Sequence, residues 1–221
     1  MLKEIFQLYV SRSSFFTKLL VEHIVLTLIA VLLITIIGLF LGILMTKNKL
    51  FASLMFALTN FFYTIPSIAL FGVLVTITGI GRNSAIIALT IYGVLPIIRN
   101  TYVGIMEVDT EIIESAIGMG TTEKELLLKI QLPLALPVIF TGFRTMVIMT
   151  IALGGIASFI GAGGLGVAIW RGITTNYPAM TMAGSLLVAG FAIIVDLFLQ
   201  NIENIMRKKI LGNEKKGVLN V

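Results

Sequence analysis

The stretch ESAIGMGTTEKELLLKIQLP, Glu114–Pro133, decides how the rest of the chain is arranged. Five of its twenty residues are charged, or 25%, against 12% for the whole chain. The sequence on either side of it is apolar. A polar, helix-forming stretch of this kind is expected to lie in water even where its neighbours do not.

The composition of the chain is that of a membrane protein. It has 221 residues, of which 57% are hydrophobic, a mean hydropathy of +1.04 and no cysteine. Soluble domains are only about 45–50% apolar, so the bilayer is the expected solvent. Without cysteine the chain forms no disulfide and no thiolate metal site. The net charge of +5 is more typical of cytoplasmic loops than of nucleic-acid binding.

Five apolar runs predict an all-α integral membrane protein with about five transmembrane helices. A helix needs about 20 apolar residues to cross the hydrocarbon core. The second run is interrupted by Pro66, and the third is short and carries Pro96. The predicted spans are Ile24–Met45, Leu54–Thr78, Ala85–Ile98, Leu136–Phe159 and Met180–Gln200.

The remaining segments complete the expected organisation. Residues 1–23 mix apolar and charged side chains, as in an amphipathic helix on a membrane surface. Residues 24–203 form the transmembrane domain, which includes the polar segment 109–133. Residues 204–221 form a basic cytoplasmic tail.

The distribution of Lys and Arg predicts the orientation in the membrane. Five spans place the termini on opposite sides, and one side then carries ten basic residues against five on the other. Cytoplasmic loops are the richer in Lys and Arg, so we expect the N-terminus outside and the C-terminus and the polar segment in the cytoplasm. The ten are Lys47, Lys49, Arg99, Lys124, Lys129, Arg207, Lys208, Lys209, Lys215 and Lys216.

The first half of the polar segment predicts a short helix with a sharp end. Asp109 or Thr110 can cap a helix over Glu111–Met119. Gly120 can then end this helix in the left-handed conformation that glycine tolerates.

The second half predicts another short helix. Thr122 and Glu125 have the T-x-x-E spacing of a capping box for a helix over Glu123–Gln131. Pro133 is expected to stop that helix, because proline lacks the backbone N–H and clashes with the preceding turn.

The two helices would form an elbow attached at both ends to membrane spans. Its small residues, Ser115 and Ala116, would permit close approach to a groove on a partner. An ordinary loop with capped helices would give the same signals.

The segment resembles a known family signature. Its spacing matches the E-A-A-x3-G-x9-I-x-L-P motif of ABC importer permeases at Glu114, Ser115, Ala116, Gly120, Ile130, Leu132 and Pro133. Only Ser115 departs, and it replaces one small residue by another. In that family the segment is a cytoplasmic coupling helix that docks on an ATPase subunit, so the resemblance implies the same role here.

The resemblance extends to a narrower group. YTIPSIALFGVL (Tyr63–Leu74), the stretch Ala88–Asp109, LPLALPVIFTGFRT (Leu132–Thr145) and IGAGGLG (Ile160–Gly166) are similar to osmoprotectant permeases for glycine betaine, carnitine and choline. This resemblance implies the type I ABC importer permease fold and a cell-membrane location. A methionine-type or other betaine-like permease is the alternative.

The resemblance also implies the partners and cofactors. A second permease subunit, identical or paralogous, would complete the solute pathway, and an extracytoplasmic binding protein would deliver the solute. The chain would be a transport subunit and not an enzyme, with no cofactor of its own and no metal site. ATP and magnesium would be bound by separate ATPase subunits, since the sequence has no G-x-x-x-x-G-K-[ST] motif.

Hypotheses that assign the chain to another class of membrane protein explain less of the sequence. A membrane enzyme would need clustered catalytic groups, but His23 is the single histidine, and we expect it at a helix end near the interface. A passive channel or scaffold would leave the coupling signature unexplained. Gly161–Gly166 fits G-x-G-x-x-G, but it follows a membrane span and not a strand, so we expect close backbone packing there.

Two charges and three aromatic residues are the remaining candidates within the membrane. Arg144 and Asp196 lie at similar depths from the cytoplasmic face and are predicted to form a structural ion pair; the alternative is that each extends to the interface alone. Tyr63, Tyr92 and Trp170 could contact a quaternary ammonium solute in the pathway, because aromatic faces attract cations. Packing or interfacial anchoring is the alternative for each.

Overall fold

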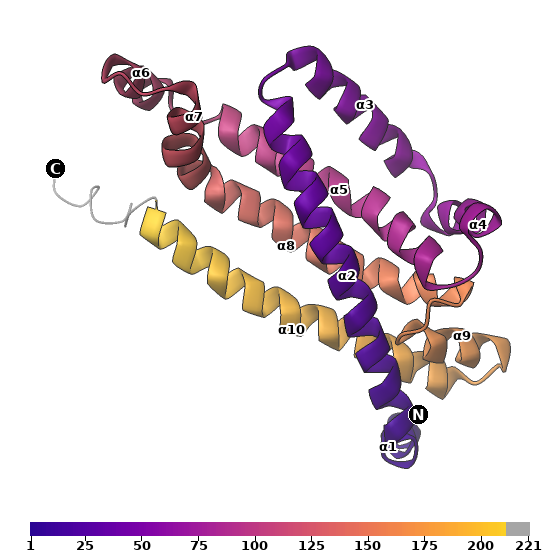
Figure 1. The fold of residues 1–221 in the computed structure, drawn as a ribbon. Coiled ribbons are helices and arrows are strands. Elements are labelled where there is room, and N and C mark those ends of the chain that lie inside the picture. Colours follow the sequence, from indigo (N-terminus) through magenta and orange to yellow (C-terminus); the bar gives the residue numbers. More distant parts are fainter. Residues whose placement is uncertain (211–221) are drawn as a thin grey trace.

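The computed structural model describes residues 1–210, and within them the chain is helical with short connections (Figure 1). A π-helical segment, η1, joins α7 to α8, and a short 3-10 turn, η2, follows α8. The tail predicted over 204–221 lies outside the described residues from residue 211 on. The elements are α1 (Leu2–Ser11), α2 (Ser13–Met45), α3 (Lys49–Thr64), α4 (Ser67–Thr78), α5 (Arg82–Met106), α6 (Thr110–Gly118), α7 (Glu123–Glu125), η1 (Leu126–Gln131), α8 (Leu132–Ala157), η2 (Ser158–Ile160), α9 (Gly166–Thr174) and α10 (Pro178–Ile210).

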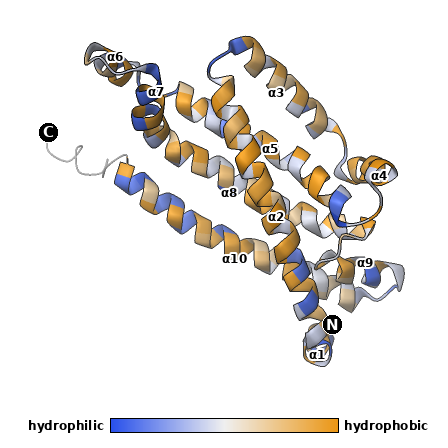
Figure 2. Ribbon diagram, in the orientation of Figure 1, coloured by the Kyte–Doolittle hydropathy of each residue, from blue (hydrophilic) through white to orange (hydrophobic). Residues whose placement is uncertain are grey.

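The prediction of an all-α membrane protein with about five spans is confirmed. Among the described residues, four helices are long and apolar enough to cross a membrane, and α3 with α4 forms a fifth candidate bent by 98°. The bend lies at Pro66, which lacks the N–H needed to continue a helix. Figure 2 shows apolar residues along the spans, with polar ones gathered at α7 and the end of α10.

Helix α5 is longer than the sequence predicted. The expected span ended at Ile98, but the helix continues to Met106 and contains Pro96. The amide of Asn100 donates a hydrogen bond of 2.9 Å to the carbonyl oxygen of Pro96. Arg99, which was expected in a loop, is an exposed residue within the helix.

The segment 1–23 is not a single amphipathic helix. Helix α1 ends at Ser11, and residues 13–23 are the first turns of α2, which runs for 33 residues. No proline or glycine separates these turns from the apolar run that follows. The expectation that His23 lies at a helix end was wrong: it lies within α2 and is fully buried, and its Nε2 donates a hydrogen bond of 3.1 Å to the carbonyl oxygen of Ile151 on α8.

Helix α5 is at the centre of the bundle. It packs against α2 and α8, while α3 and α4 contact its remaining surface and α10 packs on α8 and α9. Close approach of α2 and α5 depends on Gly38 and Gly42. A Cβ at Gly38 would lie 1.9 Å from Cγ2 of Ile97, and one at Gly42 would lie 2.6 Å from Cβ of Thr101.

The glycine-rich turn after α8, Gly161–Gly166, shows the close backbone packing that was expected there. A Cβ at Gly166 would lie 1.9 Å from the carbonyl oxygen of Gly155. The N–H of Gly164, which has a φ of +86°, donates a hydrogen bond of 3.1 Å to the carboxylate of Glu22. This turn therefore connects the start of α2 to the end of α8.

The packing of α2 on α5 gives a matched pair of substitutions. We expect Gly38→Ala to lower the melting temperature of the detergent-solubilised protein, because overpacking costs about 1–3 kcal/mol. Gly72→Ala should leave it unchanged or raise it, since no atom lies within 4 Å of the added methyl group and alanine favours helix. Thermal unfolding of both variants checks this, and equal melting temperatures would contradict the packing.

Candidate functional site

The polar elbow begins with α6, whose caps are those predicted. Between the two candidates for its N-cap, the structure selects Asp109, whose carboxylate accepts a hydrogen bond of 2.9 Å from the N–H of Glu111. Gly120 has a φ of +83°, so it reverses the chain in the conformation that residues with a Cβ adopt rarely. The N–H of Thr121 then donates a hydrogen bond of 3.2 Å to the carbonyl oxygen of Ala116, and this bond closes the turn.

The second helix of the elbow starts with the predicted capping box. The N–H of Glu125 donates to the hydroxyl of Thr122 at 3.4 Å, and the N–H of Thr122 donates to the Glu125 carboxylate at 3.3 Å. Lys129, one turn later, lies 2.7 Å from the same carboxylate. These contacts fix the start of the second helix.

The prediction that Pro133 ends this helix was wrong. The chain continues from α7 through the π-helical segment η1 into α8 without a break. An α-helix would press the Pro133 ring against the carbonyl group of Lys129, whereas a π-helical turn is wider and uses i→i+5 hydrogen bonds. The N–H of Leu132 accordingly donates to the carbonyl oxygen of Leu127. The second helix of the elbow and the membrane helix α8 are therefore one continuous rod, which α6 joins through the turn at Gly120.

A groove lies between α6 and η1. Its volume is about 430 Å³, and its lining residues are Glu111, Ile112, Ser115, Ala116, Met119 and Ile130. Met119 is 80% exposed and Ile112 is 43% exposed. Exposed apolar side chains that gather on one surface are typical of a surface that another protein covers.

The two small residues of the signature differ in their surroundings. Ser115 is exposed, whereas Ala116 is only 2% exposed. The small size of Ala116 therefore allows α6 to pack on its own chain, and only Ser115 leaves room for a partner.

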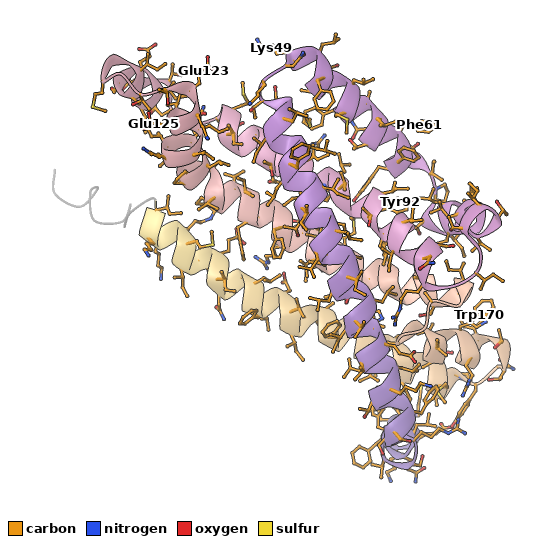
Figure 3. The ribbon with its side chains drawn as sticks, viewed as in Figure 1. Lys49, Phe61, Tyr92, Glu123, Glu125 and Trp170 are labelled. Atoms are coloured by element: carbon orange, nitrogen blue, oxygen red, sulfur yellow. The ribbon has the colours of Figure 1, made fainter. Side chains whose placement is uncertain are left out.

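The other signature residues are spread along the elbow and the start of α8. Glu114 and Gly120 are exposed, and a Cβ at Gly120 would meet no atom within 4 Å. Leu132 packs against the hydrophobic core, and Pro133 is exposed on α8. Glu123 and Glu125 mark this end of the molecule in Figure 3.

A second polar cluster lies between α8 and α10. The guanidinium group of Arg144 donates to both oxygens of Asp196, at 2.6 Å from Nε and 2.9 Å from Nη2. Such a two-bond contact is among the stronger ion-pair geometries in proteins. The structure thus brings together the two charges that the sequence placed at similar depths.

Glu203 is a third member that the sequence reasoning missed. Its carboxylate lies 3.1 Å from Nη1 of Arg144 and accepts a hydrogen bond of 2.7 Å from the hydroxyl of Thr141. Nη2 of Arg207 lies 3.5 Å from the same carboxylate. Glu203 follows Asp196 by seven residues, or two helical turns, so the spacing on one helix face could have revealed it.

The cluster borders an open cavity of about 620 Å³. Helix α8 contributes a single face to it, and α10 contributes the two carboxylates. The lining residues are Thr141, Arg144, Thr145, Ile148, Met149, Ala152, Asp196 and Glu203.

The three aromatic candidates do not form one group. The rings of Tyr63 and Tyr92 meet edge to face at 5.9 Å between centroids. The hydroxyl of Tyr63 contacts Sδ of Met149 at 2.8 Å, which places Tyr63 beside the cavity. Trp170 lies on α9 and stacks on Phe159, well away from Tyr92 in Figure 3.

Tyr92 has a structural partner at the α3–α4 break. Its hydroxyl donates a hydrogen bond to the carbonyl oxygen of Ile65, the residue before Pro66. Because the helix stops there, this carbonyl group has no helical partner. The side chain of Tyr92 thus stabilises the bend.

Comparison with known proteins gives consistent matches. Residues 34–208 match the family model described as binding-protein-dependent transport system inner membrane component. The glycine betaine/carnitine/choline transport system permease protein OpuCD of Bacillus subtilis is 40% identical over 195 residues, which cover 87% of this chain and 85% of that protein.

A fused relative and a solved structure complete the comparison. The ergothioneine transport permease/ergothioneine binding protein EgtU of Helicobacter pylori is 40% identical over 75% of this chain, but the chain spans only 30% of that protein's length. A chain from an inward-facing structure of the MetNI methionine ABC transporter has a TM-score of 0.74 at 25% identity, with 84% of this chain and 93% of that chain covered.

The charged cluster predicts an asymmetry between its members. Arg144→Met leaves Asp196 without a guanidinium partner and Glu203 with Arg207 alone, whereas Asp196→Leu leaves Arg144 paired with Glu203. Breaking a buried pair costs about 3–5 kcal/mol, and partial exposure moves the cost toward the lower end. We expect Arg144→Met to lower the melting temperature most, and the double substitution Arg144→Met/Asp196→Leu to lower it less. Additive effects of the single changes would contradict the network.

Proposed function

Because the chain belongs to the family of binding-protein-dependent transport system inner membrane components, we propose that it is the permease subunit of an ATP-driven importer for trimethylammonium solutes. Glycine betaine, carnitine and choline are the solutes named for the Bacillus relative, and ergothioneine for the Helicobacter one. All four carry a trimethylammonium group. This shared chemistry supports the solute class.

The groove of the elbow supports the coupling role. Its apolar side chains project from a segment that is otherwise polar, and the residues around it match the coupling signature of the family. We assign this groove to the docking of a cytoplasmic ATPase subunit. ATP and magnesium are bound by that subunit, while this chain supplies the docking surface and the membrane helices.

The rigid connection between elbow and membrane supports the mechanism. Since α7, η1 and α8 form one rod, a displacement of the second helix of the elbow is carried directly into α8. Closure of two ATPase subunits on ATP would pull two such rods, one from each permease, and turn the pathway between inward-facing and outward-facing states. A binding protein on the outer face delivers the solute to this pathway.

The alternatives have distinct consequences. A methionine-type permease would have the same fold, and the match to MetNI supports the fold but not the solute. Import of methionine in place of trimethylammonium solutes would favour this alternative. A passive channel would conduct solute without ATP.

The proposed orientation can be tested by cysteine labelling, since the natural chain has no cysteine. Both Lys124, in the elbow, and Arg82, at the start of α5, are exposed. We expect Lys124→Cys to be modified only from the cytoplasm and Arg82→Cys only from outside, measured in intact cells with a membrane-impermeant maleimide. Modification of Lys124→Cys from outside would reverse the orientation and exclude the coupling role.

The coupling role predicts different effects for two tryptophan substitutions on α6. Ser115→Trp places a large ring in the groove and should abolish capture of the ATPase subunit and the stimulation of its ATP hydrolysis by solute-loaded binding protein. Ile117→Trp is the matched control, because Ile117 is 56% exposed and lies outside the groove. Co-purification and ATPase assays in reconstituted membranes measure both effects.

The outcome that would exclude this docking surface is specific. Normal capture and stimulation in Ser115→Trp would show that the groove is not the contact. Equal loss in both variants would place the contact on the whole of α6.

A further inference from the structure

The cavity between α8 and α10 presents one continuous helix face. Thr141, Thr145, Ile148 and Ala152 recur at the spacing of one side of a helix, and Met149 continues this face toward Tyr63. Along α8, Thr141 and Thr145 lie beside the charged groups, and the apolar residues Ile148, Met149 and Ala152 line the wall beyond them. A pocket with this division suits a small solute that has both a charged and an apolar part.

Arg144 retains donors for such a solute. A guanidinium group has five N–H donors, and three of them are used by Asp196 and Glu203 among the described residues. Two N–H groups therefore remain for another acceptor. The Arg144 side chain is 23% exposed, so an acceptor in the cavity can reach it.

The charges of the cluster balance. Arg144 and Arg207 supply two positive charges, and Asp196 and Glu203 supply two negative charges. A solute with a net charge would upset this balance inside the membrane, where unpaired charge is costly. A zwitterion adds no net charge, so the cluster favours a zwitterion over a simple cation.

We propose that this cavity is a transit site for zwitterionic trimethylammonium solutes, an inference that rests on the proposed function. The solute carboxylate accepts hydrogen bonds from the two remaining N–H groups of Arg144. The trimethylammonium group lies toward the carboxylate of Asp196, which is 37% exposed. The solute thus aligns opposite to the Arg144–Asp196 pair without breaking it.

The apolar wall suits the methyl groups of the solute. A quaternary ammonium group has no N–H donor and presents only methyl groups, so it needs diffuse negative charge and apolar contact. Asp196 supplies the charge, while Ile148, Met149 and Ala152 supply the contact. Arg144 would then be the residue that distinguishes solutes with a carboxylate from those without one.

The test compares glycine betaine, which has a carboxylate, with choline, which has none. The import of each is measured in vesicles that contain the complete importer and its binding protein. The variant is the double substitution Arg144→Gln/Asp196→Asn, which removes both charges and leaves none of the pair stranded. We expect the ratio of glycine betaine to choline import to fall about tenfold or more, as is usual when a charge-assisted contact is lost.

Two controls separate recognition from folding. Arg144→Lys keeps the charge but loses the planar guanidinium, so it should restore the ratio in part. Arg99→Gln removes an exposed arginine of α5 and should leave the ratio unchanged. If import of both solutes falls equally in the double variant, the pair is structural and the transit site is excluded, while the proposed function stands.

A binding measurement covers the case in which the wild-type importer carries one solute. If choline alone is imported, the zwitterion site is excluded. If glycine betaine alone is imported, the thermal shift of the solubilised permease–ATPase complex decides: glycine betaine without binding protein should raise the melting temperature of wild type but not of the double variant. An equal shift in both excludes the site. Import of neither solute overturns the proposed function itself.

Discussion

The lack of hydrogen-bonding partners in hydrocarbon is the constraint on which this structure depends. Every backbone N–H and C=O at membrane depth must be satisfied within the protein, and long helices do this for most of the chain. Where a helix breaks or ends, side chains supply the hydrogen bonds that the backbone groups would otherwise lack. At the break between α3 and α4, the carbonyl group of Ile65 is satisfied by the hydroxyl of Tyr92. At the turn after α8, the N–H of Gly164 is satisfied by Glu22.

The same constraint explains which features the sequence predicted well. Apolar runs can only be buried or in lipid, so the number and order of the spans followed from hydropathy. The caps of the elbow also followed, because Asp109, Thr122 and Gly120 act on their own backbone within a few residues. Such local interactions are encoded by spacing alone.

Features that depend on tertiary contact or on an irregular helical turn were missed. The continuity of the elbow with α8 depends on a π-helical turn that makes room for Pro133, and proline by itself indicates a helix end. The burial of His23 depends on the Ile151 carbonyl group of another helix. Glu203 was placed at the end of the transmembrane domain, yet α10 continues past it, and its carboxylate contacts Arg144. For His23 and Glu203 the deciding partner is distant in sequence, whereas the turn at Pro133 is a local change in the spacing of the helical hydrogen bonds.

The continuous rod from α7 through α8 also connects the two surfaces to which we have assigned functions. The groove of the elbow lies near the first turns of this rod. Arg144 lies 21 residues after Glu123, about 30 Å along the helix. If the rod moves against α10, Arg144 is displaced relative to the carboxylates of Asp196 and Glu203, which lie outside the rod. The bonds of the cluster hold α8 against α10 in the present arrangement, and the same bonds must lengthen or exchange if α8 moves. A solute carboxylate on Arg144 would weaken its hold on Asp196 and lower the resistance to that movement. Stability and solute recognition would then be two consequences of one set of contacts.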